Sequence, residues 1–376
     1  MLYRLWMLMV KELLQLARNK LFAPLVLIGP LLEMSLIAWS TSAPIQNLPT
    51  AVVDLDRSAE SRALLTALEN TRTFDFTFYL DNPNDVTPLI EHGKATAGII
   101  IPAGYSRRLT HPAGDPPQVA FLLDGADPIS ANEALNAALG VAESLNQQLI
   151  VDTFGPEAMA LSPVQTRLRV RYNEEMKKSV YTVPSELGLM LFAVALMIAG
   201  ISIARERELG TLEQLMTTPI RRFELVVAKS VPAVLLGYLV FLGMLAVAIT
   251  AFGIPMRGSW PLLLATSFFF ILVELGIGLM ISAYARNQNQ GLMLGFTWVM
   301  IEFFFSGYGV PVENMPEILR RIAPAFPIYH YMIIFRSILL KGVGIDAFWP
   351  HLMAGLVIGT VVMSTAIWLL GRQKWE

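Results

Sequence analysis

The sequence contains no cysteine, and this absence removes several kinds of chemistry at once. Without thiols the chain forms no disulfide, holds no cysteine-ligated metal or iron–sulfur cluster, and has no thiolate nucleophile. Histidine is scarce as well: the four are His92, His111, His330 and His351. Their spacing along the chain matches no metal-binding motif. We therefore predict that the chain has no metal site.

Charged residues are also few, at 15% of 376 residues, whereas hydrophobic residues make up 54%. The mean hydropathy of +0.53 is too high for an ordinary soluble domain and indicates an integral membrane protein. The net charge of -2 argues against a protein that binds nucleic acid.

Several apolar runs are long enough to cross a bilayer, which takes about 20 residues of helix. Six runs qualify, at residues 21–40, 184–204, 230–252, 262–284, 291–310 and 352–371. The first run follows a charged leader and exceeds the typical length of a signal-peptide core, so we expect it to stay uncleaved. The sequence therefore predicts a polytopic α-helical membrane protein with six transmembrane helices.

Lysine and arginine predict the orientation of these spans. Twelve of them lie in four segments on one side of the membrane: 1–20, 205–229, 285–290 and 372–376. Only five lie in the two short loops on the other side, 253–261 and 311–351. The positive-inside rule therefore places both termini in the cytoplasm, and the long segment 41–183 outside it.

The leader, residues 1–20, has the pattern of an amphipathic helix lying along the membrane surface. Its polar face carries Arg4, Lys11, Gln15 and Arg18, and its apolar face carries Leu2, Leu5, Trp6, Met9, Leu13 and Leu16. The alternative is a charged flank that fixes the topology of the first span without forming a stable helix.

Residues 41–183 have the pattern of an inserted α/β domain. Four short apolar stretches read as strands: "TAVVDLD", "FDFTFYL", "ATAGIIIP" and "QVAFLLDG". Ser58 is the expected N-cap of a helix, and a long helix follows the last strand, with Leu135, Leu139, Ala142 and Leu145 on one face. Strands alternating with helices predict a parallel or mixed sheet covered by helices.

Four aspartates fall at strand ends of this domain: Asp54, Asp56, Asp124 and Asp127. Strand ends often hold ligands in α/β domains, but strand-end aspartates also form turns and helix caps. Because no base, nucleophile or glycine-rich phosphate loop accompanies them, we expect caps, and a binding, gating or docking role for the domain.

The segment 205–217 is dense in charge between two spans. Gly210 ends the preceding helix, Thr211 and Gln214 fit a capping box, and Thr218 and Pro219 begin a further helix. The short helix between them exposes an apolar patch of Leu212, Leu215 and Met216, which a partner protein would cover. The alternative is a salt-bridged turn in water.

At this point the sequence resembles a known family. "RERELGTLEQLMTTPIRRFEL" is similar to the coupling segment of ABC-2-type permeases, the membrane subunits of ATP-binding-cassette exporters with the type V fold. "FSGYGVPVENMPEILRRIAPAFPIYHYMIIFRSILLKG", at 305–342, resembles the short outer helices before the last span. "RYNEEMKKSVYTVP" is similar to the entry to the second span, although "PSELG" stands where a Pro-Gly is usual. The resemblance covers essentially the whole chain and is greatest to bacterial multidrug-type permeases with a large periplasmic domain.

The resemblance implies partners that this sequence lacks. It contains no GxxxxGK[ST] motif, so ATP and Mg²⁺ would be bound by a partner ATPase subunit, and this chain would hold no cofactor. A second permease copy or a related permease would complete the transporter in the inner membrane of a bacterium. A periplasmic adaptor is a further candidate partner.

The family's coupling role is carried over to the segment 205–217. Thr211 and Glu213 match the Gly-Thr-x-Glu core of the motif, and the other expected coupling residues are Glu206, Glu208, Leu212, Leu215 and Met216. The short helix would sit in a groove on the ATPase and pass its closure to the second and third spans.

Three carboxylates lie within predicted spans: Glu33, Glu274 and Glu302. Each is costly in lipid and is a candidate for the translocation path, where it would favour cationic or amphiphilic cargo. The alternative is that they are protonated or hydrogen-bonded between helices. Glu186, at the mouth of its span, is expected to be interfacial.

The residues 312–341 are too short and too charged to span, and prolines divide them into a broken helical pair that re-enters the outer surface. In the family such helices form an outer gate. The expected gate residues are Pro311, Met315, Pro316, Pro327, Tyr329 and Arg336. A purely anchoring role fits the same pattern.

The leading hypothesis is thus a permease subunit that exports a drug-like, amphiphilic or lipid substrate, using ATP hydrolysed by another subunit. A second hypothesis is a membrane-anchored receptor or secretion scaffold that binds a partner through its outer domain. A third is an intramembrane enzyme that uses His330 or His351 with Glu302. The sequence does not identify the substrate, because a cavity formed by two chains would select it.

Overall fold

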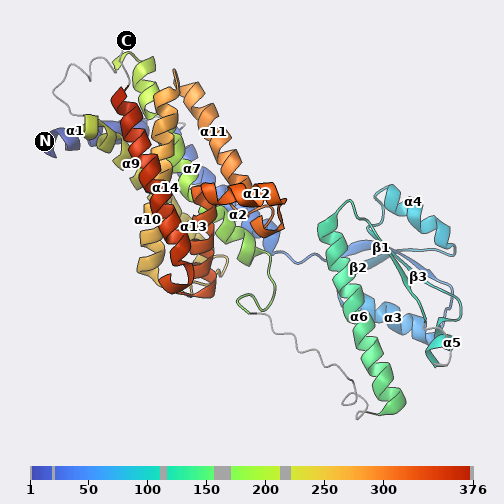
Figure 1. The fold of residues 1–376 in the computed structure, drawn as a ribbon. Helices are drawn as coiled ribbons and strands as arrows, with labels where there is room; N and C mark the ends of the chain where they lie inside the picture. The colour runs from blue at the N-terminus through green and yellow to red at the C-terminus, as the bar shows by residue number, and fades with distance from the viewer. Residues whose placement is uncertain (1, 19–21, 111–116, 156–170, 212–221, 373–376) are drawn as a thin grey trace. The chain divides into compact units, whose positions relative to one another are not determined.

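A computed structural model describes residues 2–18, 22–110, 117–155, 171–211 and 222–372. The chain divides into two compact units (Figure 1). One comprises Met1–Ser42 and Arg169–Glu376 and is almost entirely helical, and the other, Ala43–Leu168, contains a sheet. The fold class is confirmed: a helical membrane protein with an N-terminal helix and an α/β domain inserted early in the chain.

The helical unit contains the long apolar helices. Its elements are α1 (Leu2–Arg18), α2 (Phe22–Ser42), α7 (Ser179–Glu208), α9 (Arg222–Thr250), α10 (Trp260–Tyr284), α11 (Gln288–Phe305), η3 (Val312–Asn314), α12 (Glu317–Ile322), η4 (Ala323–Ala325), α13 (Pro327–Arg336), η5 (Ser337–Lys341) and α14 (Ile345–Arg372). Among the described residues, 5 helices are long and apolar enough to cross a membrane: α2, α7, α9, α10 and α14. The predicted span 291–310 falls on α11, which is not among them. The number is 6 if the bent pair formed by α12 and α13 with their extensions, which the sequence predicted to re-enter, counts as one span.

Helix α7 is the central element of this unit. It packs against α2, α9, α10, α11 and α13, and 83% of its most apolar window is buried. Helices α2 and α14 lie at the periphery, with only 17% and 11% of the corresponding windows buried. Their exposed leucines and tryptophans, such as Leu32 and Trp39, suit contact with lipid or with another membrane helix.

Small residues allow α7 to approach α10 and α11 closely. A Cβ atom added to Gly291 of α11 would lie 2.6 Å from the carbonyl oxygen of Gly200 in α7. One added to Gly278 of α10 would lie 2.8 Å from the carbonyl oxygen of Leu196. Backbone-to-backbone contact of this kind is a common way for membrane helices to pack.

The α/β unit has a mixed sheet. Its elements are β1 (Leu48–Asp54), α3 (Ala59–Asn70), β2 (Phe74–Tyr79), η1 (Pro83–Asp85), α4 (Val86–Glu91), β3 (Ala97–Ile101), α5 (Tyr105–Thr110), β4 (Ala120–Leu123) and α6 (Pro128–Phe154). The strand order is β2-β1-β3-β4, with β1 parallel to β2 and β3, and β4 antiparallel to β3. Parallel strands joined by α3 and α4 follow from the alternation of strands and helices.

The aspartates at the strand ends form turns and caps, as predicted. Asp54 accepts hydrogen bonds from the Asp56 and Arg57 N–H groups and from Ser61 Oγ, and Asp127 caps α6. Asp56 reaches further along the chain, accepting from the N–H groups of Gly104 at 2.8 Å and Ser106 at 3.0 Å. Ser58 is the N-cap of α3, as the sequence indicated.

Helix α6 packs on the sheet mainly through small residues, and not through the face that carries Leu135 and Leu139. Leu135 and Leu139 are 43% and 59% exposed, whereas the buried residues are Ala134, Ala138 and Val141. The inner face of α6 thus presents small side chains, which permit a close approach to the sheet and α3, so the larger leucines lie outside.

Candidate functional site

Four charged side chains from three helices meet at one end of the helical unit, and we call them the charge cluster. Lys11 and Glu12 come from α1, Glu206 from the last turn of α7, and Lys229 from α9. Glu206 Oε1 lies 2.6 Å from Lys11 Nζ and 3.3 Å from Lys229 Nζ. Lys229 Nζ lies 3.0 Å from Glu12 Oε1, so the cluster joins all three helices.

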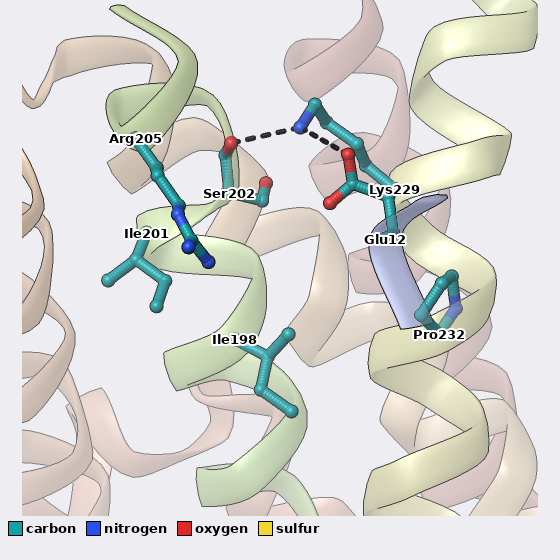
Figure 2. Close-up of a pocket in the computed structure, with 7 residues that line it drawn as sticks. All are labelled: Glu12, Ile198, Ile201, Ser202, Arg205, Lys229 and Pro232. Atoms are coloured by element: carbon teal, nitrogen blue, oxygen red, sulfur yellow. Dashed lines mark hydrogen bonds and ion pairs between the residues drawn. The ribbon is translucent and has the colours of Figure 1, made fainter. Parts of the chain in front are cut away.

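The two central members of the charge cluster are buried. The Lys229 and Glu206 side chains are only 1% and 2% exposed. Lys229 also donates to the Ser202 carbonyl at 3.0 Å, and Figure 2 shows its ammonium between that carbonyl and Glu12. A small pocket, open to the surface, adjoins these residues between α1, α7 and α9. Buried charges persist only when paired and hydrogen-bonded, which explains why each has more than one partner.

The charge cluster extends to the start of the predicted coupling segment. Thr211 Oγ1 donates hydrogen bonds to the Glu206 carboxylate and to the Glu206 carbonyl. Residues 205–208 continue helix α7 through Glu208, and Gly210 follows with φ +67. Glycine adopts this left-handed conformation readily, so the helix ends where the sequence indicated. Leu212, Glu213, Leu215 and Met216 lie outside the described residues.

The other side of the same α7 terminus is held to α10 and α11. Ser282 Oγ accepts from the N–H groups of Ile203 at 2.9 Å and Ala204 at 3.1 Å. Arg207 donates to the Ala285 carbonyl at 2.5 Å, and Glu208 accepts from the Gln288 N–H at 2.8 Å. A displacement of this terminus would therefore be transmitted to α1, α9, α10 and α11 together.

The three predicted intramembrane carboxylates do not meet at one place. Glu274 and Glu302, on α10 and α11, are both fully buried and face each other beside Trp298. No described residue is placed to make a well-formed hydrogen bond to either carboxylate. Glu33, by contrast, is exposed on α2, and the carboxylate it interacts with is that of Glu186, by like-charge repulsion.

Glu186 is buried within the protein, with 2% of its surface exposed. It lies one residue after Ser185 in α7 and bonds to the Tyr308 side chain. The segment after α11 covers this end of α7, where Tyr181 donates to the Gly307 carbonyl. The expected position of Glu186 at the membrane surface stays a prediction.

Arg336, at the end of α13, links the short helices to α7. Its Nη2 donates to Ser185 Oγ at 2.7 Å and to the Gly307 carbonyl at 3.2 Å. Its guanidinium also lies over the ring of Tyr181, 4.6 Å from the ring centre, and Tyr181 donates to the same Gly307 carbonyl. Arg336 therefore fixes the position of α13 against α7 and the turn after α11.

The other predicted gate residues mark the boundaries of short helices. Pro311 and Pro316 precede η3 and α12, Met315 ends η3, and Pro327 begins α13. The helical pair on either side of Phe326 is bent by 87°. Proline starts a helix well but cannot continue one, which accounts for the break.

Two of the four histidines, which the sequence shows as scattered, lie together. His330 Nδ1 is 3.0 Å from His351 Nδ1, and the Tyr329 ring contacts both imidazoles. The intramembrane-enzyme hypothesis paired a histidine with Glu302, but the described partners of Glu302 are Glu274 and Trp298. The structure thus pairs the histidines with each other.

The sequence analysis missed Glu12 and Lys229 as candidate functional residues. Both carried a detectable signal. Glu12 is the one carboxylate in the leader and lies at the border of its apolar face, and Lys229 directly precedes a long apolar run. A charge in such a position favours a buried partner, although the pattern alone does not identify it.

Comparison with known proteins agrees with this architecture. Residues 20–369 match the family described as ABC-2 family transporter protein. The chain is 30% identical to the probable multidrug ABC transporter permease YbhR of Escherichia coli, with 100% of each chain covered. It is 26% identical to YbhS, a second probable multidrug permease of that organism, covering 98% of this chain and 96% of the relative.

A third relative is the inner membrane transport permease YhhJ of Escherichia coli, 24% identical, with 95% of this chain and 94% of the relative covered. The family model covers far more than half of the chain, and the printed sequence has no P-loop motif. The chain therefore belongs to the ABC-2 family of transporter proteins, as a multi-pass inner-membrane permease subunit whose ATPase is a separate subunit.

Proposed function

We propose that this permease exports amphiphilic, drug-like or lipid molecules from the cytoplasm. The names of YbhR and YbhS, probable multidrug permeases, support this substrate class. Both termini and the segment 205–217 would face the cytoplasm, which the distribution of lysine and arginine supports. The α/β unit would then be periplasmic, where it would bind substrate or an adaptor protein.

The charge cluster is the observation that supports a coupling mechanism. The segment 212–217 would bind the ATPase, with Glu213 and the apolar residues Leu212, Leu215 and Met216 in contact with it. Thr211 and Glu206 connect that segment to the end of α7. Movement of the ATPase would therefore change the position of α7 relative to α9 through Glu206 and Lys229. Glu208 would pass the same movement to the α10–α11 turn.

The substrate path and gate are proposed from the remaining polar residues. Glu274 and Glu302 are candidates for the path because a buried carboxylate pair attracts a cation. Glu33 is exposed in one chain, so it would contribute where two permeases meet. The short helices bounded by Pro311, Met315, Pro316 and Pro327 would act as the outer gate, with Tyr329 and Arg336 at its base.

The complete transporter would contain two permeases and two ATPase subunits. The exposed leucines of α2 and α14 provide apolar surface for a second permease. The full-length similarity to both YbhR and YbhS fits either a second copy of this chain or a related permease.

The decisive experiment measures ATP hydrolysis by the partner ATPase purified with this chain in nanodiscs. We expect wild-type chains to co-purify with the ATPase and to stimulate hydrolysis. Glu213→Arg combined with Leu212→Asp should abolish both effects, because it reverses a charge and removes apolar contact at the docking segment. Glu60→Arg, an exposed change in the α/β unit, is the matched control and should alter neither. Hydrolysis unaffected by the double substitution would contradict the coupling role.

A further inference from the structure

The histidine pair has a geometry that suits a metal ion. His330 lies in the second turn of α13 and His351 in the second turn of α14, and these two helices pack together. Their Nδ1 atoms are 3.0 Å apart, and their ring centres are 5.3 Å apart. The contact joins residues 21 positions apart in the sequence.

The hydrogen bonds define which nitrogens carry protons. His330 Nε2 lies 2.9 Å from the Pro324 carbonyl oxygen, and a carbonyl oxygen only accepts, so Nε2 carries the hydrogen. In the neutral ring, His330 Nδ1 then has a free lone pair. His351 Nδ1 supplies the one hydrogen between the rings. In the other neutral tautomer of His351, with that hydrogen on Nε2, both Nδ1 atoms carry a lone pair.

The distance between these lone pairs is close to that of a metal site. Two nitrogens each about 2.0–2.1 Å from Zn²⁺, at a tetrahedral angle, lie roughly 3.3 Å apart. The observed 3.0 Å therefore needs an opening of a few tenths of an ångström and a tilt of both rings, because their Nδ1 atoms now face each other along one line. Ligand histidines also usually donate their other N–H to a backbone carbonyl, which is what His330 does toward Pro324.

The surroundings leave room for a further ligand. His330 is 6% exposed and His351 is half-buried. Both line a small pocket with Thr266, Tyr331 and Leu352, which has room for about one water molecule bound to the ion. Within the described residues no group of three or more His, Cys, Asp or Glu forms a metal site. A site here would therefore have two protein ligands and open positions.

We propose that His330 and His351 bind a divalent transition-metal ion, Zn²⁺ or Cu²⁺, and thereby link α13 to α14. Neutral imidazole is a good ligand for both ions. With only two protein ligands the affinity is in the micromolar range, so the ion acts as a reversible ligand and not as a permanent structural element. Binding requires both imidazoles to be neutral, with the His351 hydrogen on Nε2, and is therefore weaker at acidic pH, where the rings are protonated. This proposal does not depend on the direction of transport or on the substrate.

The first test titrates Zn²⁺ into the purified full-length chain in nanodiscs, without a histidine tag and near neutral pH. We expect one ion per chain at micromolar concentration. His330→Gln and His351→Gln should each weaken binding at least tenfold. His92→Gln, a change at an exposed histidine of the α/β unit, is the matched control and should leave binding unchanged. Absence of stoichiometric binding, or binding that both pair variants retain, would overturn the proposal.

A spectroscopic measurement on the wild-type chain tests the site without requiring that any variant folds. Electron paramagnetic resonance of bound Cu²⁺ should show coupling to two imidazole nitrogens. Each single variant that folds should show one nitrogen. A wild-type spectrum with one nitrogen or none would overturn the proposed site, whatever the variants do.

Discussion

At the scale of single residues, Lys229 is the charge on which the cluster depends. It is 1% exposed and lies within 3.3 Å of both Glu12 and Glu206. Removing one partner of a buried ion pair leaves an uncompensated charge, which destabilises a protein more strongly than loss of a surface pair.

We expect Lys229→Met to lower the free energy of unfolding by about 3 kcal/mol, the lower end of the usual range because Lys11 still pairs with Glu206. Thermal unfolding of the nanodisc-embedded chain would measure the change. Adding Glu12→Gln to Lys229→Met should recover part of the loss, since it removes one of the two carboxylates that would then share Lys11. A double variant less stable than the single one would contradict the pairing.

Lys177→Met is the matched control for this effect. Lys177 pairs with Glu175 at 2.6 Å, but the two side chains are 59% and 71% exposed. Exposed ion pairs contribute under about 1 kcal/mol, so this variant should unfold close to the wild-type temperature.

Asp56 should make the α/β unit sensitive to acid. A hydrogen bond from the Ser58 side chain, with further bonds from the Ser106 and Gly104 N–H groups, lowers the pKa of Asp56 to about 2. A pKa lowered by folding means that the carboxylate stabilises the folded state above its ordinary pKa of 3.8. That stabilisation is lost as the pH falls from about 4 toward about 2.

Hydrogen exchange of the Gly104 and Ser106 amides in the full-length chain measures this prediction. Their protection should fall over the acidic range in the wild type. Asp56→Asn should show lower protection at neutral pH and little further change on acidification. Protection that is identical in both chains at every pH would contradict the role of Asp56.

At the scale of secondary-structure elements, the contact of α7 with α11 depends on Gly291. A Cβ there would come within 2.6 Å of the Gly200 carbonyl, and backbone atoms cannot move aside without separating the helices. Gly291→Ala should therefore destabilise the helical unit by about 1–3 kcal/mol, the usual range for overpacking. Thermal unfolding in nanodiscs would measure it.

Gly140→Ala is the control for the intrinsic effect of the substitution. Gly140 lies in α6 with nothing within 4 Å of an added Cβ. Alanine favours helix over glycine by roughly 0.5–1 kcal/mol, so this variant should be slightly stabilised. If Gly291→Ala and Gly140→Ala changed the stability to the same extent, close packing at Gly291 would not explain the effect of Gly291→Ala.

The elements themselves were largely predictable from local pattern, but their partners were not. Ser58 and Gly210 marked helix ends correctly because caps depend on neighbouring residues. Leu135 and Leu139 were placed on one face of α6, but periodicity did not show that α6 packs through Ala134, Ala138 and Val141 instead. Lys11 and Glu206 are 195 residues apart, and no local sequence pattern predicts that they pair.

At the scale of the whole molecule, orientation in the membrane is open to a direct test because the chain contains no cysteine. Glu60→Cys in α3 and Arg286→Cys between α10 and α11 each introduce one exposed thiol. A membrane-impermeant maleimide should label Glu60→Cys in cells with a permeabilised outer membrane. Arg286→Cys should react only after the inner membrane is opened, and the reverse pattern would contradict the proposed topology.

The family and the division into two units could be predicted from the sequence, because the hydropathy, the α/β pattern and the coupling motif all extend over many residues. The meeting of His330 with His351 was not, because it depends on how α13 packs on α14 after the 87° bend. Such contacts depend on tertiary packing, which local sequence patterns do not reveal.

The charge cluster also has a consequence for how the chain is made. Lys11 and Glu12 leave the ribosome early, but their partners Glu206 and Lys229 follow 195 and 217 residues later. At about 5–20 residues per second, α1 therefore waits roughly 10–40 s with both charges unpaired. During that interval only contact with the membrane surface and α2 can hold it. Completion of the cluster thus reports that the first three long helices have been inserted, and a chain that fails at this step displays unpaired charges to quality-control proteases.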